Sequence, residues 1–120
     1  MKEILERILK FRDERGWKKF HKPKELAASI AIEVGELLEV FQWLSEEEVK
    51  KLLEENEGFR ERLREEIADI LIYTLILAHE TGIEPREAIL RKIEVNRRKY
   101  PVNEYYGVAR MDLLEGRKVE

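Results

Sequence analysis

The sequence predicts an all-α fold: a bundle of four or five helices that assembles as an oligomer. Only six Gly and three Pro occur in 120 residues, and Leu, Ile, Glu, Lys and Arg dominate the rest, a composition that favours helix. Apolar residues recur at the three- to four-residue period of a helix over most of the chain. No segment alternates in the manner of a strand, and no solenoid-type repeat is present.

Turn and capping residues divide the chain into five expected helices. These cover residues 2–15, 23–44, 46–55, 59–81 and 85–100. Pro23 and Pro85 each suit the first turn of a helix. Ser45 followed by Glu48 is a capping-box pattern, which predicts the start of the third helix. Gly82 is typical of the residue that ends a helix such as the fourth.

The length fits a single domain. We expect one helical domain over residues 1–101. Residues 102–120 lack clear periodicity, and we expect a C-terminal tail that is either loose or used in assembly.

The second expected helix is apolar almost all round. Between residues 26 and 44, apart from Gly35, its polar residues are Ser29, Glu33, Glu36, Glu39 and Gln42. A helix of this kind is buried on several sides, and a monomer of this length has few places to bury it. The pattern therefore predicts a homodimer or a larger homo-oligomer.

Composition and charge exclude several classes of protein. With no cysteine, the chain has no disulfide, no zinc–thiolate site and no thiol nucleophile. A net charge of −3 argues against polymeric nucleic acid and anionic membrane as partners. The amphipathic, charged N-terminus is unlike a secretory signal, and the longest apolar stretch, 67–79, is too short to cross a bilayer. We expect a cytoplasmic protein.

Four acidic residues lie where a helix of a soluble protein should be apolar: Glu33 and Glu36 in one helix, Glu66 and Asp69 in another. Each pair is spaced i,i+3, so at about 100° per residue both members share one face. Only Glu66 has a basic residue one turn away, Arg62, so helix salt bridges do not explain the set. Carboxylates in an apolar stripe need a counter-charge, and a divalent metal ion would supply it.

The types of residue present indicate which metal fits. Bundles that hold two iron or manganese ions use Glu-x-x-His, but neither histidine, His21 or His79, follows an acidic residue by three positions. All-oxygen coordination remains, which favours Mg²⁺ or Mn²⁺. Such ions commonly bind substrate phosphates and lower the pKa of a bound water, so hydrolysis at phosphorus is the expected reaction. Spacing does not show which carboxylate binds metal and which one activates water.

The ordered motifs resemble those of a known family. Glu33-Val-Gly-Glu36 followed by Glu66-Ile-Ala-Asp69 is similar to the E-x-x-E…E-x-x-D signature of the MazG-like, all-α nucleoside triphosphate pyrophosphohydrolases. The segments GWKKFHKP, EVGELLEVFQW, EEIADILIYTLILA and NRRKYP follow the dCTP pyrophosphatase branch in order and spacing, over roughly residues 10–101. The resemblance implies Mg²⁺-dependent cleavage of a nucleoside triphosphate to the monophosphate and pyrophosphate, nucleotide-pool cleaning, and assembly as a dimer or tetramer.

The resemblance also implies roles for individual residues. Its metal ligands would be Glu33, Glu36, Glu66 and Asp69. Trp17 and Trp43 match aromatic positions near the base, where stacking suits them, although a core or interface role is a close alternative. His21 would stack on the ligand or donate to it, or else be a solvated loop residue.

Three further positions carry both a site role and a structural alternative. Tyr73 lies one turn beyond Asp69 on the same face, so its hydroxyl is expected in or beside the acidic cluster rather than in a plain core. Asn96 and Lys99, spaced i,i+3, are expected to face the triphosphate. The alternative is that the basic end of this helix interacts with its own C-terminus.

Two functions from different classes are therefore open. The first is a metal-dependent pyrophosphohydrolase that acts on dCTP or a related dNTP. The second is a non-catalytic oligomeric helical module that binds nucleotide or metal. The presence of all four acids favours the enzyme.

Overall fold

The structure is a computed structural model that describes residues 1–108. Within these residues the chain is all-helical, without strands, which confirms the predicted fold class. The elements in chain order are α1 (Lys2–Glu14), the 3₁₀ helix η1 (Lys18–Phe20), α2 (Pro23–Phe41), α3 (Glu46–Glu55), α4 (Glu57–Glu80), α5 (Pro85–Lys99) and α6 (Val102–Tyr105).

The five expected helices are present, with small differences at their ends. The second helix ends at Phe41 rather than at residue 44, because Gln42 leaves the helical conformation and Trp43 follows with a φ of 71°. The fourth begins at Glu57 rather than at residue 59. The short α6 and η1 were not expected.

Side-chain caps explain where α3 and α4 begin. The Ser45 hydroxyl accepts from the Glu48 backbone N–H at 3.1 Å, and the Glu48 carboxylate accepts from the Ser45 N–H at 2.9 Å. The predicted capping box is therefore confirmed. The Asn56 side chain accepts from the backbone N–H of Phe59 at 2.9 Å, which starts α4 two residues earlier than its apolar pattern.

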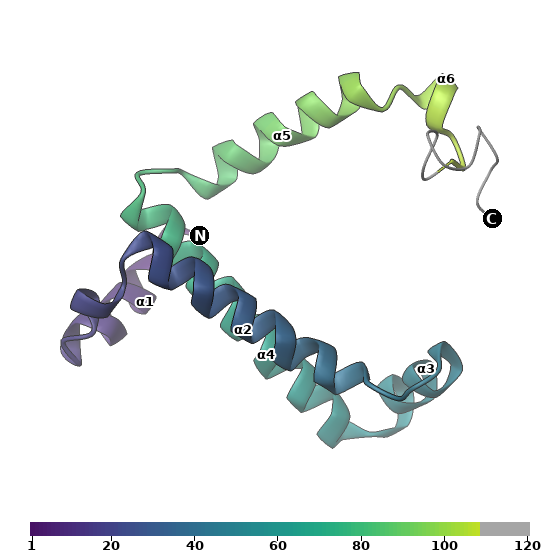
Figure 1. Cartoon of the computed structure of the whole chain (residues 1–120), viewed down its shortest axis with the longest axis horizontal. Helices are drawn as coiled ribbons and strands as arrows, with labels where there is room; N and C mark the ends of the chain where they lie inside the picture. Colours follow the sequence, from purple (N-terminus) through teal and green to yellow (C-terminus); the bar gives the residue numbers. More distant parts are fainter. Residues whose placement is uncertain (109–120) are drawn as a thin grey trace. The chain divides into compact units, whose positions relative to one another are not determined.

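The chain forms two compact units, Met1–Ile83 and a second that begins at Glu84. In the first, α2 and α4 lie side by side along their length, and both α1 and α3 also pack on α4 (Figure 1). Leu26, Val40 and Ile76 are its buried apolar side chains. This arrangement places the middle of α2 against the middle of α4, which are the segments that carry the four acids.

The second unit contains α5 and α6 among its described residues. The rings of Tyr100 and Tyr105 meet edge to face with centroids 5.1 Å apart, which holds α6 to the end of α5. The division into a domain over 1–101 and a tail over 102–120 stays a prediction, and residues 109–120 of that tail lie outside the described residues.

Among residues 1–108, no helix is both long enough and apolar enough to cross a membrane.

Candidate functional site

The acidic residues of α2 and α4 come together. One carboxylate oxygen from each of Glu33, Glu66 and Asp69 lies within 4.8 Å of the others. Glu36 lies one turn from Glu33 on α2, and its charge acts on both Glu33 and Glu66. Residues from two helices thus form a single acidic cluster, and its role as a metal site stays a prediction.

Crowding of negative charge changes the proton affinity of this cluster. The pKa of Glu33 is raised to about 7, first of all by burial, and then by its interaction with Glu36 and by the charges of Glu36, Asp69 and Glu66. Burial also raises the pKa of Glu66, and the charge of Glu36 contributes. Carboxylates this close together tend to bind protons, because their negative charges repel one another. A bound cation would take the place of those protons.

Two oxygens of the cluster have no hydrogen-bond partner in the described part of the chain. They are Glu33 Oε2 and Glu66 Oε2, and both are buried. Buried polar atoms are normally paired, so unpaired acceptors that face a set of carboxylates call for a positive partner. The donor set consists of carboxylate oxygens, and it fits Mg²⁺ or Mn²⁺ better than a soft metal.

A pocket of about 630 Å³ adjoins the acidic cluster. It lies between α1, the segment that follows α1, and α4, and Asp69 belongs both to the pocket wall and to the cluster. Its apolar walls include Ile8 and Phe11 of α1 and Ile72 and Ile76 of α4. A flat ligand in this pocket would therefore have its polar end beside the carboxylates.

Three of the residues expected to contact substrate line this pocket: Trp17, His21 and Tyr73. The rings of His21 and Tyr73 meet edge to face, with centroids 6.3 Å apart. Trp17 is 44% exposed and packs edge to face on Phe11 at 5.7 Å. The structure thus brings these aromatic rings next to the acidic cluster, while their role stays a prediction.

The surroundings of His21 lower its affinity for a proton. Its Nδ1 is buried without a hydrogen-bond partner among residues 1–108. Burial lowers the pKa of His21, and the positive charge of Arg12 lowers it further, against the opposing charges of Glu80 and Asp13. These surroundings favour the neutral form of the imidazole.

The remaining expected contacts are Trp43, Asn96 and Lys99. Trp43 follows the last turn of α2, is 90% exposed and does not line the pocket. Asn96 and Lys99 are on α5 of the second unit, where the Lys99 ammonium lies 5.4 Å from the centroid of the Tyr100 ring. Their expected contact with the triphosphate stays a prediction.

One residue of the pocket was missed by the sequence analysis. Arg12 lines the pocket and is only 3% exposed, and it forms an ion pair with Glu80 at the end of α4. Leu5, Ile8 and Arg12 follow helical spacing, so a charge in an apolar stripe was visible here as well. A charged residue in an apolar helical stripe, the pattern that singled out the four acids, also singles out Arg12.

The sequence matches that of a known family over most of its length. Residues 28–111 match the MazG-like family. This range contains all four acids of the cluster, Glu33, Glu36, Glu66 and Asp69, and it ends beyond Lys99 of α5.

Named relatives agree with that match. The chain is 40% identical over 105 residues to dCTP pyrophosphatase 1 of Bos taurus and 37% identical over 107 residues to that of Homo sapiens. Each alignment covers 86% of this chain and 60% of the relative, so the chain spans less than two thirds of their length. A crystal structure of a pyrophosphatase from Archaeoglobus fulgidus is similar, with a TM-score of 0.77 and 53% identity over 84% of this chain and 92% of that one.

Proposed function

The chain belongs to the MazG-like family, and from this premise we propose that it is a Mg²⁺-dependent nucleoside triphosphate pyrophosphohydrolase. It would cleave a dNTP, dCTP or a related pyrimidine nucleotide, to the dNMP and pyrophosphate, and so clean the nucleotide pool. The observation that carries the proposal is the acidic cluster of α2 and α4 beside an aromatic-lined pocket.

The four carboxylates are the groups that would hold the metal. Glu33, Glu66 and Asp69, together with Glu36 beside Glu33, would offer hard oxygen ligands from two helices. Glu33 Oε2 and Glu66 Oε2 lack a partner among the described residues. Bound Mg²⁺ would offset the charge of the phosphates and lower the pKa of a bound water. Because helices position the ligands, the cluster would keep its geometry when the substrate arrives.

The adjoining pocket would take the base. Its apolar walls and the rings of Trp17, His21 and Tyr73 suit a flat aromatic ring, since every base has a π-face. Asp69 connects the pocket to the cluster, so a base in the pocket would direct the phosphates toward the acids. The names of the two mammalian relatives support dCTP as the first substrate to test.

We also propose a homodimer or homotetramer. Large apolar side chains remain exposed in the first unit: Ile32 is 64% and Leu38 65% exposed on α2, and Leu71 is 56% exposed on α4. Exposed apolar residues on neighbouring helices favour burial against another copy. The net charge of −3 argues against polymeric nucleic acid as a partner. The cytoplasmic location expected from the sequence stays a prediction.

The direct test is pyrophosphate release from each common NTP and dNTP with Mg²⁺. Glu36→Gln should lower turnover by about 100-fold or more, because it removes a carboxylate that would bind metal. Glu39→Gln, an exposed position on the same helix, is the matched control and should leave turnover unchanged. Equal turnover in wild type and Glu36→Gln would place the site elsewhere.

The same substrate panel distinguishes the enzyme from a binding module. A protein that melts at a higher temperature with nucleotide and Mg²⁺, yet releases no pyrophosphate from any of them, would be the non-catalytic alternative. Release of orthophosphate instead of pyrophosphate would show that cleavage occurs at a different bond.

A further inference from the structure

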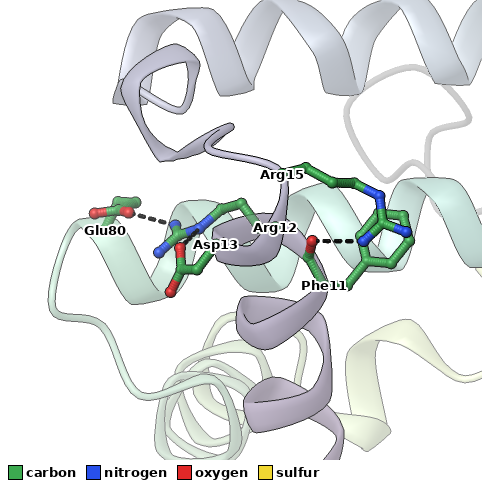
Figure 2. Close-up of polar contacts among 5 residues, drawn as sticks. All are labelled: Phe11, Arg12, Asp13, Arg15 and Glu80. Carbon is green, nitrogen blue, oxygen red and sulfur yellow. Dashed lines mark hydrogen bonds and ion pairs between the residues drawn. The ribbon is translucent and has the colours of Figure 1, made fainter.

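Arg12 is a buried cation held by two carboxylates. Its Nη1 donates to Glu80 Oε1 at 2.6 Å, and its Nε donates to Asp13 Oδ1 at 2.9 Å (Figure 2). Arg12 is 3% exposed and the Glu80 side chain 19% exposed, whereas that of Asp13 is 55% exposed. The pair with Glu80 is the better shielded of the two, and it joins positions 68 residues apart.

Arg12 lies directly before the pocket wall that Trp17 and His21 form. Arg12 lines the pocket, and its backbone carbonyl accepts from the N–H of Trp17 at 3.1 Å. Trp17 then leads into η1, after which the chain reaches His21. Arg12 belongs to α1 and is tied to α4 through Glu80, so this ion pair helps to decide where Trp17 and His21 lie relative to Tyr73 of α4.

The local charge indicates that Arg12 binds carboxylates of the protein itself and not a phosphate of the substrate. One positive charge is shared between the carboxylates of Asp13 and Glu80, so the three side chains together carry a net charge of −1. A phosphate group beside this trio would be repelled. The planar fork of arginine, with two nitrogens already engaged, is suited to fixing one geometry between two helices.

We propose that the Arg12–Glu80 ion pair is a positioning pair, which holds the wall made by Trp17 and His21 in place and so sets the affinity of the pocket for nucleotide. This inference rests on the proposed function. The ion pair does not act on the phosphates, so breaking it changes substrate binding and leaves the cleavage step at the acidic cluster intact. Its variants differ from wild type in KM and not in kcat.

The test uses two conservative variants of the full chain, Arg12→Lys and Glu80→Gln. Lysine keeps the charge but loses the fork, and glutamine keeps an acceptor oxygen but loses the charge. We measure kcat and KM for dCTP with Mg²⁺, and Kd for the non-hydrolysable α,β-imido analogue of dCTP by calorimetry. KM and Kd should rise by about tenfold or more, while kcat stays within about twofold.

The matched control is Arg64→Lys, which changes an exposed arginine that pairs with Glu61 on α4. It should leave KM, kcat and Kd at their wild-type values. All measurements are made below the temperature at which circular dichroism shows each variant begin to unfold. In a Trp43→Phe background, the emission of Trp17 should shift in Arg12→Lys, because the wall that carries Trp17 moves; it should not shift in Arg64→Lys.

The outcomes separate this inference from the proposed function. If the wild type binds the analogue but releases no pyrophosphate, the proposed function fails, and the Kd values of the variants still decide the role of the pair. If the wild type turns over dCTP and the two variants lower kcat at constant KM, or match wild type in KM and Kd, the positioning role is overturned. A wild type that neither binds nor cleaves nucleotide overturns both.

Discussion

The imidazole of His21 meets the ring of Tyr73 edge to face, with an interplanar angle of 82°. The two residues come from segments far apart in the sequence, and they form adjoining parts of one pocket. His21 Nδ1 is buried and has no hydrogen-bond partner in the described part of the chain. Such burial favours the neutral imidazole, because a protonated ring would leave a buried N–H donor without a partner.

We therefore predict that His21 titrates below its ordinary pKa of 6.5. Its folded-state pKa is depressed, so its contribution to stability is complete above 6.5 and is lost as the pH falls through the folded value. Arg12→Gln should raise the pKa of His21 toward its ordinary value, because the charges of Glu80 and Asp13 then act unopposed. NMR titration measures the pKa of His21 in the wild type and in Arg12→Gln, and the variant His79→Gln assigns the signals of the two histidines. A His21 pKa above 6.5 in the wild type would contradict the prediction.

The acidic cluster should make the metal-free protein less stable as the pH rises. Folding raises the pKa of Glu33 from 4.5 to about 7, so between these values the folded state binds more protons than the unfolded state. The stability contributed by Glu33 is therefore present below pH 4.5 and lost as the pH approaches 7. In EDTA, the melting temperature of the wild type minus that of Glu33→Gln should decrease as the pH rises from 4.5 to about 7.

Two comparisons check the cause of that pH dependence. Glu39→Gln, an exposed carboxylate on the same helix, should follow the wild-type curve. Added Mg²⁺ should stabilise the wild type more at pH 8 than at pH 5, since metal binding displaces protons. A wild-type curve parallel to that of Glu33→Gln would show that Glu33 does not hold a proton in the folded state.

The parts of this molecule that depend on local sequence could be predicted, and those that depend on packing between helices could not. The start of α3 follows from the hydroxyl of Ser45 and the carboxylate of Glu48, three residues apart. The start of α4 was placed two residues late, because the apolar pattern begins at Phe59 while the cap is Asn56. The capping side chain, and not the first apolar residue of the periodic pattern, determines where a helix begins.

The same distinction applies to the candidate site. Charges in apolar stripes identified Glu33 and Asp69, because burial of a carboxylate is costly whatever the rest of the fold. The pocket could not be derived, since it requires α1 to pack on α4 and place Trp17 near Tyr73. The ion pair between Arg12 and Glu80 depends on the same packing, which periodicity within one helix does not contain.

Loss of the capping box should destabilise the chain by a measurable amount. Ser45→Ala removes the hydroxyl that accepts from the Glu48 N–H, and it should lower the free energy of unfolding in urea by about 1 kcal/mol. Glu48→Gln is the control, because glutamine can still accept from the Ser45 N–H at the same position. An Ser45→Ala protein as stable as wild type would mean that water replaces the cap at no cost.

A charge on the exposed apolar surface of α2 should weaken self-association. Leu38 is 65% exposed, and Leu38→Glu places a carboxylate where we expect another copy to pack. Light scattering coupled to gel filtration should give a lower mass than for the wild type at the same concentration. Glu39→Lys changes the charge of the next residue and is the control for a general electrostatic effect. A wild-type protein that is monomeric at all concentrations would rule out the proposed oligomer.

At position 43, glycine should give a more stable protein than alanine. Its φ of 71° is in the left-handed region, which costs residues with a Cβ about 1–2 kcal/mol relative to glycine, and its 90% exposed side chain offers few contacts in return. After the extra chain entropy of glycine is subtracted, Trp43→Gly should be about 0.5–1 kcal/mol more stable than Trp43→Ala, which keeps the strain. Urea unfolding measures this difference, and two variants of equal stability would show that the backbone relaxes. If the KM for dCTP rises equally in both variants, the indole ring contributes to substrate binding, and the strain is retained for that function.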